Sequence, residues 1–265
     1  MIFALALPVL TLTHRVLWGA CVIGYGVLLW KLWSERLWNV YPFFSSYLAY
    51  RLVRAVVLYA IPYNTNAYGW VWLASAPLSW VFYILVVLEL YSLVLRNYKG
   101  IATLGRWTLM AALGISILIS ALTLSADLSN SAESYPVLRY FTVIERGVIS
   151  SLAIFLLLIT AFLVWYPVPL SRNVVVYSVV YSVYFLSTTM GFLVRNITGN
   201  DAMSMVHLVL SSVTVCCLVV WIVLLNRKSE SLTMVVGQHW RQEEEEQLME
   251  QLGTINSTLL RAARK

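Results

Sequence analysis

The sequence contains few charged residues. Only 11% of its 265 residues are Asp, Glu, Lys or Arg, against about 25% in ordinary globular proteins. Hydrophobic residues make up 60% of the chain, which is more apolar surface than a soluble domain of this length can hide. The formal charge of +6 does not form a basic face for nucleic acid, because residues 227–265 carry six acidic and six basic side chains and the excess lies in short loops elsewhere. The composition therefore predicts a membrane protein whose partner is lipid and not nucleic acid.

Cysteine is also scarce, and Cys21, Cys216 and Cys217 lack the spacing of metal ligands. We interpret them as small buried residues. The chain has no His-Glu-x-x-His pair, phosphate-binding loop, Gly-x-Ser-x-Gly motif or paired aspartates, and residues 202–226 hold no lysine for a retinal Schiff base. We therefore predict a protein that is not an enzyme and that holds no metal or cofactor.

Apolar stretches long enough to cross a membrane, for which about 20 residues are needed, occur seven times in the chain. They cover residues 13–33, 40–62, 68–95, 106–125, 137–165, 172–195 and 202–226. Pro77 falls inside the third stretch and is expected to kink it or to mark a packing contact. The sequence predicts an all-α fold, with a bundle of seven transmembrane helices in residues 1–226 and a cytoplasmic tail in residues 227–265.

The orientation follows from the loops that hold basic residues, which stay in the cytoplasm. Basic residues occur in the loops after the first, third and fifth stretches and at the start of the tail: Lys31, Arg36, Arg96, Lys99, Arg106, Arg172, Arg227 and Lys228. The loops after the second, fourth and sixth stretches are uncharged or acidic, with Asp127, Glu133 and Asp201, although Arg195 lies at the edge of the last one. We expect the N-terminus outside and the C-terminus in the cytoplasm, in a bacterial cytoplasmic membrane.

Six ionisable residues fall at membrane depth: Arg51, Arg54, Glu89, Glu145, Arg146 and His207. Charges at this depth are costly, so they face the bundle interior, a cavity or a partner. Ion pairs between the arginines and glutamates could fix the helix packing. Alternatively, three guanidinium groups against two carboxylates leave a positive excess for a small anionic ligand or a lipid headgroup. A proton relay through Glu89, Glu145 and His207 is the third interpretation.

The tail carries a short apolar seam on a polar helix. Its members are spaced four, three, four and three residues apart: Leu248, Leu252, Ile255, Leu259 and Ala262. This is about two heptads of a coiled-coil pattern, too short to be stable alone in water. The helix is expected to self-associate, to dock a partner, or to lie against the bundle or bilayer. The acidic run 243–246 disfavours binding to an anionic leaflet.

Several short motifs resemble an uncharacterised family of bacterial seven-helix membrane proteins. They are Tyr41-Pro-Phe-Phe, Tyr47-Leu-Ala-Tyr50, Glu89-Leu-Tyr91, Leu95-Arg-Asn-Tyr-Lys-Gly100, Leu104-Gly-Arg106, Ile144-Glu-Arg146 and Leu170-Ser-Arg-Asn173. The resemblance covers roughly residues 40–225 and implies that Glu89, Glu145 and Arg146 recur in the family, but it implies no activity. A more distant similarity is to the seven-helix input domains of bacterial sensors, from which this chain departs by lacking a kinase, cyclase or phosphodiesterase domain.

Two hypotheses about function follow. In the first, which we prefer, the protein is a membrane assembly or scaffold component whose tail joins copies into an oligomer or docks a partner. In the second, it is a receptor that binds a small anionic ligand or lipid near Arg51, Arg54 and Glu145 and signals through the tail. A transporter is a weaker alternative, because the chain shows no internal repeat and no pair of broken helices.

Overall fold

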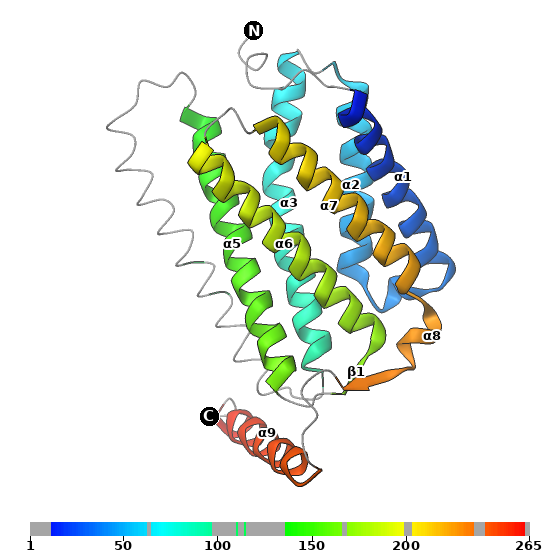
Figure 1. The fold of residues 1–265 in the computed structure, drawn as a ribbon, viewed down its shortest axis with the longest axis vertical. Coiled ribbons are helices and arrows are strands. Elements are labelled where there is room, and N and C mark those ends of the chain that lie inside the picture. The colour runs from blue at the N-terminus through cyan, green and yellow to red at the C-terminus, as the bar shows by residue number, and fades with distance from the viewer. Residues whose placement is uncertain are drawn as a thin grey trace. The chain divides into compact units, whose positions relative to one another are not determined.

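The computed structural model describes residues 12–62, 65–96, 110, 114, 136–165, 169–198, 203–235 and 242–262. Nearly all of these residues are helical (Figure 1). The helices are α1 (Leu12–Ser34), η1 (Leu37–Asn39), α2 (Pro42–Ala60), α3 (Asn66–Val94), α5 (Pro136–Trp165), α6 (Arg172–Thr198), α7 (Met203–Leu224), α8 (Arg227–Glu230) and α9 (Gln242–Ala262). Two short strands, β1 (Pro169–Ser171) and β2 (Thr233–Val235), complete the described part. The predicted all-α fold class is confirmed for these residues.

Four of the described helices are long and apolar enough to cross a membrane. They contain the stretches Thr13–Ser34, Asn66–Val94, Arg172–Gly191 and Met205–Leu224. Helices α2 and α5 also form where spans were predicted, but α2 carries two arginines, and the apolar stretch found in α5 covers only Gly147–Ala161. The predicted span 106–125 and residues 1–11 lie outside the described residues, apart from 110 and 114. The membrane prediction is supported, and the count of seven spans and their orientation stay predictions.

The chain divides into two compact units, the first from residues 1–89 and 186–229 and the second from residues 90–185 and 230–265. In the first unit α1 packs against α2 and α7 (Figure 1). Phe44 of α2 meets Trp221 of α7 with the ring centroids 5.1 Å apart in an edge-to-face arrangement. The buried side chains of this unit include Tyr25, Leu28, Leu32, Phe44, Leu48, Leu218 and Trp221.

Gly24 allows the close approach of α1 and α7. A Cβ atom at this position would lie 3.0 Å from Cδ1 of Leu218 and 3.4 Å from its Cβ. Small residues at helix contacts are the usual device for packing within membranes. Gly19 and Gly26 of the same helix would meet nothing within 4 Å, so of these three glycines only Gly24 serves this packing.

The second unit contains α5, the first part of α6 and a two-stranded antiparallel sheet that the sequence did not predict. Leu170 of β1 pairs with Met234 of β2, and the pairing continues as the Arg172 amide donates to the Leu232 carbonyl at 3.0 Å. The buried Asn173 donates its side-chain amide to Oε2 of Glu230, also at 3.0 Å. These bonds attach the segment that follows α7 to the beginning of α6.

Candidate functional site

Arg51 lies at the centre of a polar and aromatic cluster in the first unit. Its Nε and Nη2 donate hydrogen bonds to Oη of Tyr25 at 3.3 and 3.1 Å. The guanidinium carbon is 5.6 Å from the ring centroid of Tyr25 and 5.9 Å from that of Tyr47, within the range of cation–π attraction. Arg51 therefore ties α2 to α1 through a buried tyrosine that the sequence analysis did not single out.

Arg54, one turn further along α2, contacts α3 instead. Its Nε donates to Oγ of Ser75 at 2.8 Å and its Nη1 to Oγ of Ser79 at 3.4 Å. Tyr50 joins the same cluster, because its hydroxyl donates to the Ser75 carbonyl at 2.5 Å and lies 2.9 Å from Oγ of Ser79. The two serines are spaced i, i+4 on either side of Pro77, and this spacing was the one sequence signal that could have identified them.

Glu89 binds the first backbone amides of α2. Its Oε1 accepts from the Phe43 amide at 2.8 Å and its Oε2 from the Phe44 amide at 3.0 Å, while the residue is only 6% exposed. The first amides of a helix have no partner within the helix, and they carry the positive end of its dipole. Pro42 occupies the first helical position, where its missing N–H costs nothing. A buried carboxylate of α3 therefore fixes the point where α2 begins.

The other predicted membrane charges have different surroundings. His207 is exposed on α7 in the first unit, and Glu145 is half-buried on α5 in the second. The side chain of Arg146 lies outside the described residues. The described part of the chain contains no group of three or more His, Cys, Asp or Glu residues that could hold a metal. The predicted ion pairs and the proton relay are not tested by these positions and stay predictions.

A second charged cluster joins the C-terminal ends of α1 and α7. The Lys31 ammonium donates to the Ile222 carbonyl at 2.6 Å and lies 3.8 Å from a carboxylate oxygen of Glu35. The other oxygen of Glu35 accepts the Arg227 amide at 2.5 Å, at the first residue of α8. These C-terminal ends carry basic residues of the predicted cytoplasmic side. We therefore expect the contacts to fix the direction in which the chain leaves α7 and enters the tail.

The predicted tail seam lies on α9, which continues through Gly253 without a break. Leu252 is buried, Leu248 and Leu259 are half-buried, and Ile255 is 47% exposed. An open groove of about 470 Å³ runs past Ile255, between the side chains of Gln247, Gln251 and Thr254. The side chain of Ala262 lies outside the described residues.

No protein-family model, curated protein or solved structure matches this chain.

Proposed function

We propose that this chain is a non-enzymatic component of a membrane assembly, in which α9 joins copies of the chain or docks a partner protein. In this proposal seven spanning helices, with the N-terminus outside, form a platform in a bacterial cytoplasmic membrane. The observation that carries the proposal is the apolar seam of α9, of which Ile255 stays 47% exposed on a helix whose other residues are mostly polar. An exposed seam residue at a heptad position is available for contact with a second helix.

The charged side chains predicted at membrane depth bond to other residues of the same unit, and this supports an assembly component over a receptor. Arg51 and Arg54 bond to Tyr25 and Ser75 of neighbouring helices, and Glu89 binds the start of α2. These contacts fix helix positions within the unit, as expected of a platform. The tail helix is then the part of the chain most suited to recruitment.

Native mass spectrometry of protein extracted gently from its own membrane tests the proposal. The matched truncation ends at residue 241, immediately before α9, so that β2 and its pairing with β1 remain. We expect the full chain to be a defined oligomer or heteromer and the truncated chain to be a monomer.

A pair of point variants separates the seam from the rest of the helix. Ile255→Glu places a charge in the seam, while Ser257→Glu adds the same charge two residues further, on the exposed opposite side of α9. Loss of the oligomer in the first variant alone supports the proposal. The proposal is overturned if the full chain, the truncated chain and both point variants are all monomers, or if the truncated chain is still an oligomer. A small anion that stays bound to such monomers favours the receptor hypothesis.

A further inference from the structure

An open groove of about 760 Å³ lies where α1 ends and the chain turns into η1. Its lining includes three tryptophans with large exposed fractions, 67% for Trp30, 69% for Trp33 and 40% for Trp38. Leu29, Ser34 and Arg36 complete the part of the lining that matters here. All of these residues belong to the first unit and to one continuous segment of chain.

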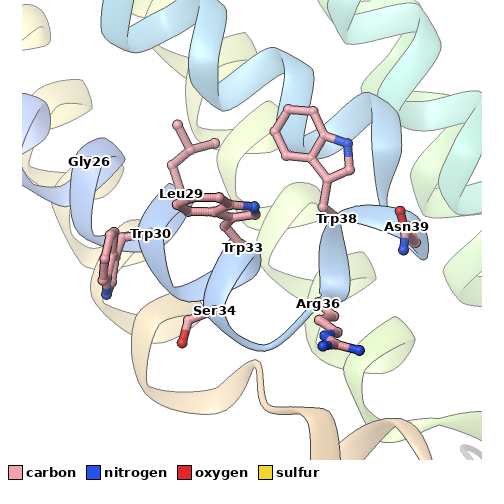
Figure 2. Close-up of a pocket in the computed structure, with 8 residues that line it drawn as sticks. All are labelled: Gly26, Leu29, Trp30, Trp33, Ser34, Arg36, Trp38 and Asn39. Carbon is pink, nitrogen blue, oxygen red and sulfur yellow. The ribbon is translucent and has the colours of Figure 1, made fainter.

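The groove has an apolar end and a cationic end. Figure 2 shows the Trp38 indole extending from the η1 turn away from Arg36, whose side chain points the opposite way, while Leu29 and Trp33 lie on α1 across from Trp38. Tryptophan prefers the level of lipid headgroups, with its ring against acyl chains and its N–H toward water. The order of side chains along the groove therefore follows the order of a phospholipid, from acyl chain to headgroup.

The backbone of Arg36 contributes to this arrangement. With φ 56° and ψ 24°, Arg36 is left-handed, and it is the one residue other than glycine with a positive φ in the described part of the chain. This conformation is uncommon for a residue with a Cβ atom and costs about 1 kcal/mol. It reverses the chain after α1 and brings Trp38 alongside the helix end, and such strain is typical of binding and switch regions.

The Arg36 amide donates to the Trp33 carbonyl at 3.0 Å, but its guanidinium has no partner within the residues that the structure describes. Its neighbour Glu35, the nearest carboxylate in sequence, already contacts Lys31 and the Arg227 amide. A planar guanidinium matches the oxygens of a phosphate and can form two hydrogen bonds with it. The cationic end of the groove therefore has free hydrogen-bond donors that suit an anion, and no carboxylate in the described part of the chain occupies them.

We propose that this groove binds an anionic phospholipid, with its phosphate on Arg36 beside Ser34 and its acyl chains along Leu29, Trp33 and Trp38. The groove opens on α1, one of the helices long and apolar enough to span the membrane, so lipid is the molecule that surrounds it. Its size falls in the range of sites for small molecules, about 300–1,000 Å³. An inorganic anion would leave the apolar end unused, which is why the lipid is the proposed occupant.

The experiment titrates the purified full chain with phosphatidylglycerol or with phosphatidylcholine, which is neutral overall, and counts bound lipids by native mass spectrometry. We expect phosphatidylglycerol to bind the wild-type chain at least tenfold more tightly than phosphatidylcholine. Arg36→Gln is expected to remove this preference. The matched control is Arg15→Gln, which removes the same charge from an exposed position near the other end of α1 and should leave the preference unchanged.

A second pair of variants tests the apolar end. Trp38→Leu should weaken phosphatidylglycerol binding several-fold, while Trp70→Leu on α3, at a tryptophan that is more exposed than Trp38, should not. The proposal is overturned if the wild-type chain binds both lipids equally, or if Arg15→Gln weakens binding as much as Arg36→Gln. It is also overturned if millimolar inorganic phosphate displaces the lipid completely, because the site would then recognise a free anion.

Discussion

The carboxylate of Glu89 offers a direct test of how the first unit is held together. Its two oxygens accept the Phe43 and Phe44 amides at 2.8 and 3.0 Å. Glu89→Gln keeps the size of the side chain but replaces one acceptor oxygen by an NH₂ group, which cannot accept a hydrogen bond. One of the two amides then loses its partner, and the start of α2 loses the negative charge beside it. Glu89→Ala leaves both amides without the carboxylate.

The size of the effect follows from these contacts. A hydrogen bond to a charged group contributes about 1.5–3 kcal/mol, and a buried amide left without a partner costs about 1–3 kcal/mol. A charge at a helix N-terminus adds about 0.3–1 kcal/mol. Removing the charge also recovers part of the cost of burying a carboxylate, which acts in the opposite direction. Together these contributions should lower the free energy of unfolding by about 2 kcal/mol for Glu89→Gln and by about 3–4 kcal/mol for Glu89→Ala.

The assay is unfolding by SDS in mixed micelles, followed by tryptophan fluorescence. A loss of 2 kcal/mol shifts the unfolding equilibrium about thirtyfold, since 1.4 kcal/mol is tenfold. Hydrogen exchange of residues 43–46 supplies a local reading and should speed up in both variants. Glu250→Gln, at an exposed carboxylate of α9, is the control. If both Glu89 variants unfold like the wild-type chain and exchange at residues 43–46 is unchanged, the carboxylate does not hold α2.

Three further predictions concern packing and bonding elsewhere. Arg51→Met and Tyr25→Phe should each lower the free energy of unfolding by about 1–2 kcal/mol, and the double variant by little more than either alone, as measured by a double-mutant cycle. Gly24→Val should destabilise by about 1–3 kcal/mol in the same SDS assay, because its side chain meets Leu218, while Gly19→Val should change stability by less than about 0.5 kcal/mol. Asn173→Ala removes the donor to Glu230 and should speed hydrogen exchange of residues 233–235 several-fold.

The helices could be predicted well because each depends on local signals. The third predicted span, 68–95, is observed as Asn66–Val94, and the sixth, 172–195, as Arg172–Thr198. Long apolar runs bounded by polar turns are sufficient for this, since a helix in lipid satisfies its own backbone hydrogen bonds. Helix α9 could also be predicted from a local signal, the heptad spacing of its apolar residues. The contacts of its seam could not be predicted.

The sheet of β1 and β2 could not be predicted for the opposite reason. Each strand has only three residues, and the partners Leu170 and Met234 are far apart in the sequence. A strand this short shows no useful alternation of apolar and polar residues. The pairing depends on residues 230–235 lying beside the start of α6, and on the bond from Asn173 to Glu230, which are consequences of tertiary structure.

The membrane charges show where sequence reasoning stops. The sequence predicts Glu89, Arg51 and Arg54 at membrane depth and favours partners of opposite charge for them. For Glu89 the structure shows bonds to backbone amides, which carry no signature in the sequence beyond Pro42 at the helix start. A carboxylate can be stabilised by a helix N-terminus as well as by an arginine. Counting opposite charges therefore does not reveal which groups balance one another.

Arg54 shows what this means for function. Within the described residues its donors reach only Ser75 and Ser79, whose neutral hydroxyls satisfy hydrogen bonds without cancelling the charge. Arg51 differs, because the rings of Tyr25 and Tyr47 add cation–π attraction to its bonds. If α2 crosses the membrane as the sequence predicts, a guanidinium with only neutral partners there needs water or an anion nearby. The anionic-ligand interpretation therefore rests on Arg54 more than on Arg51, and Arg54→Gln is the variant in which a bound anion should be lost first.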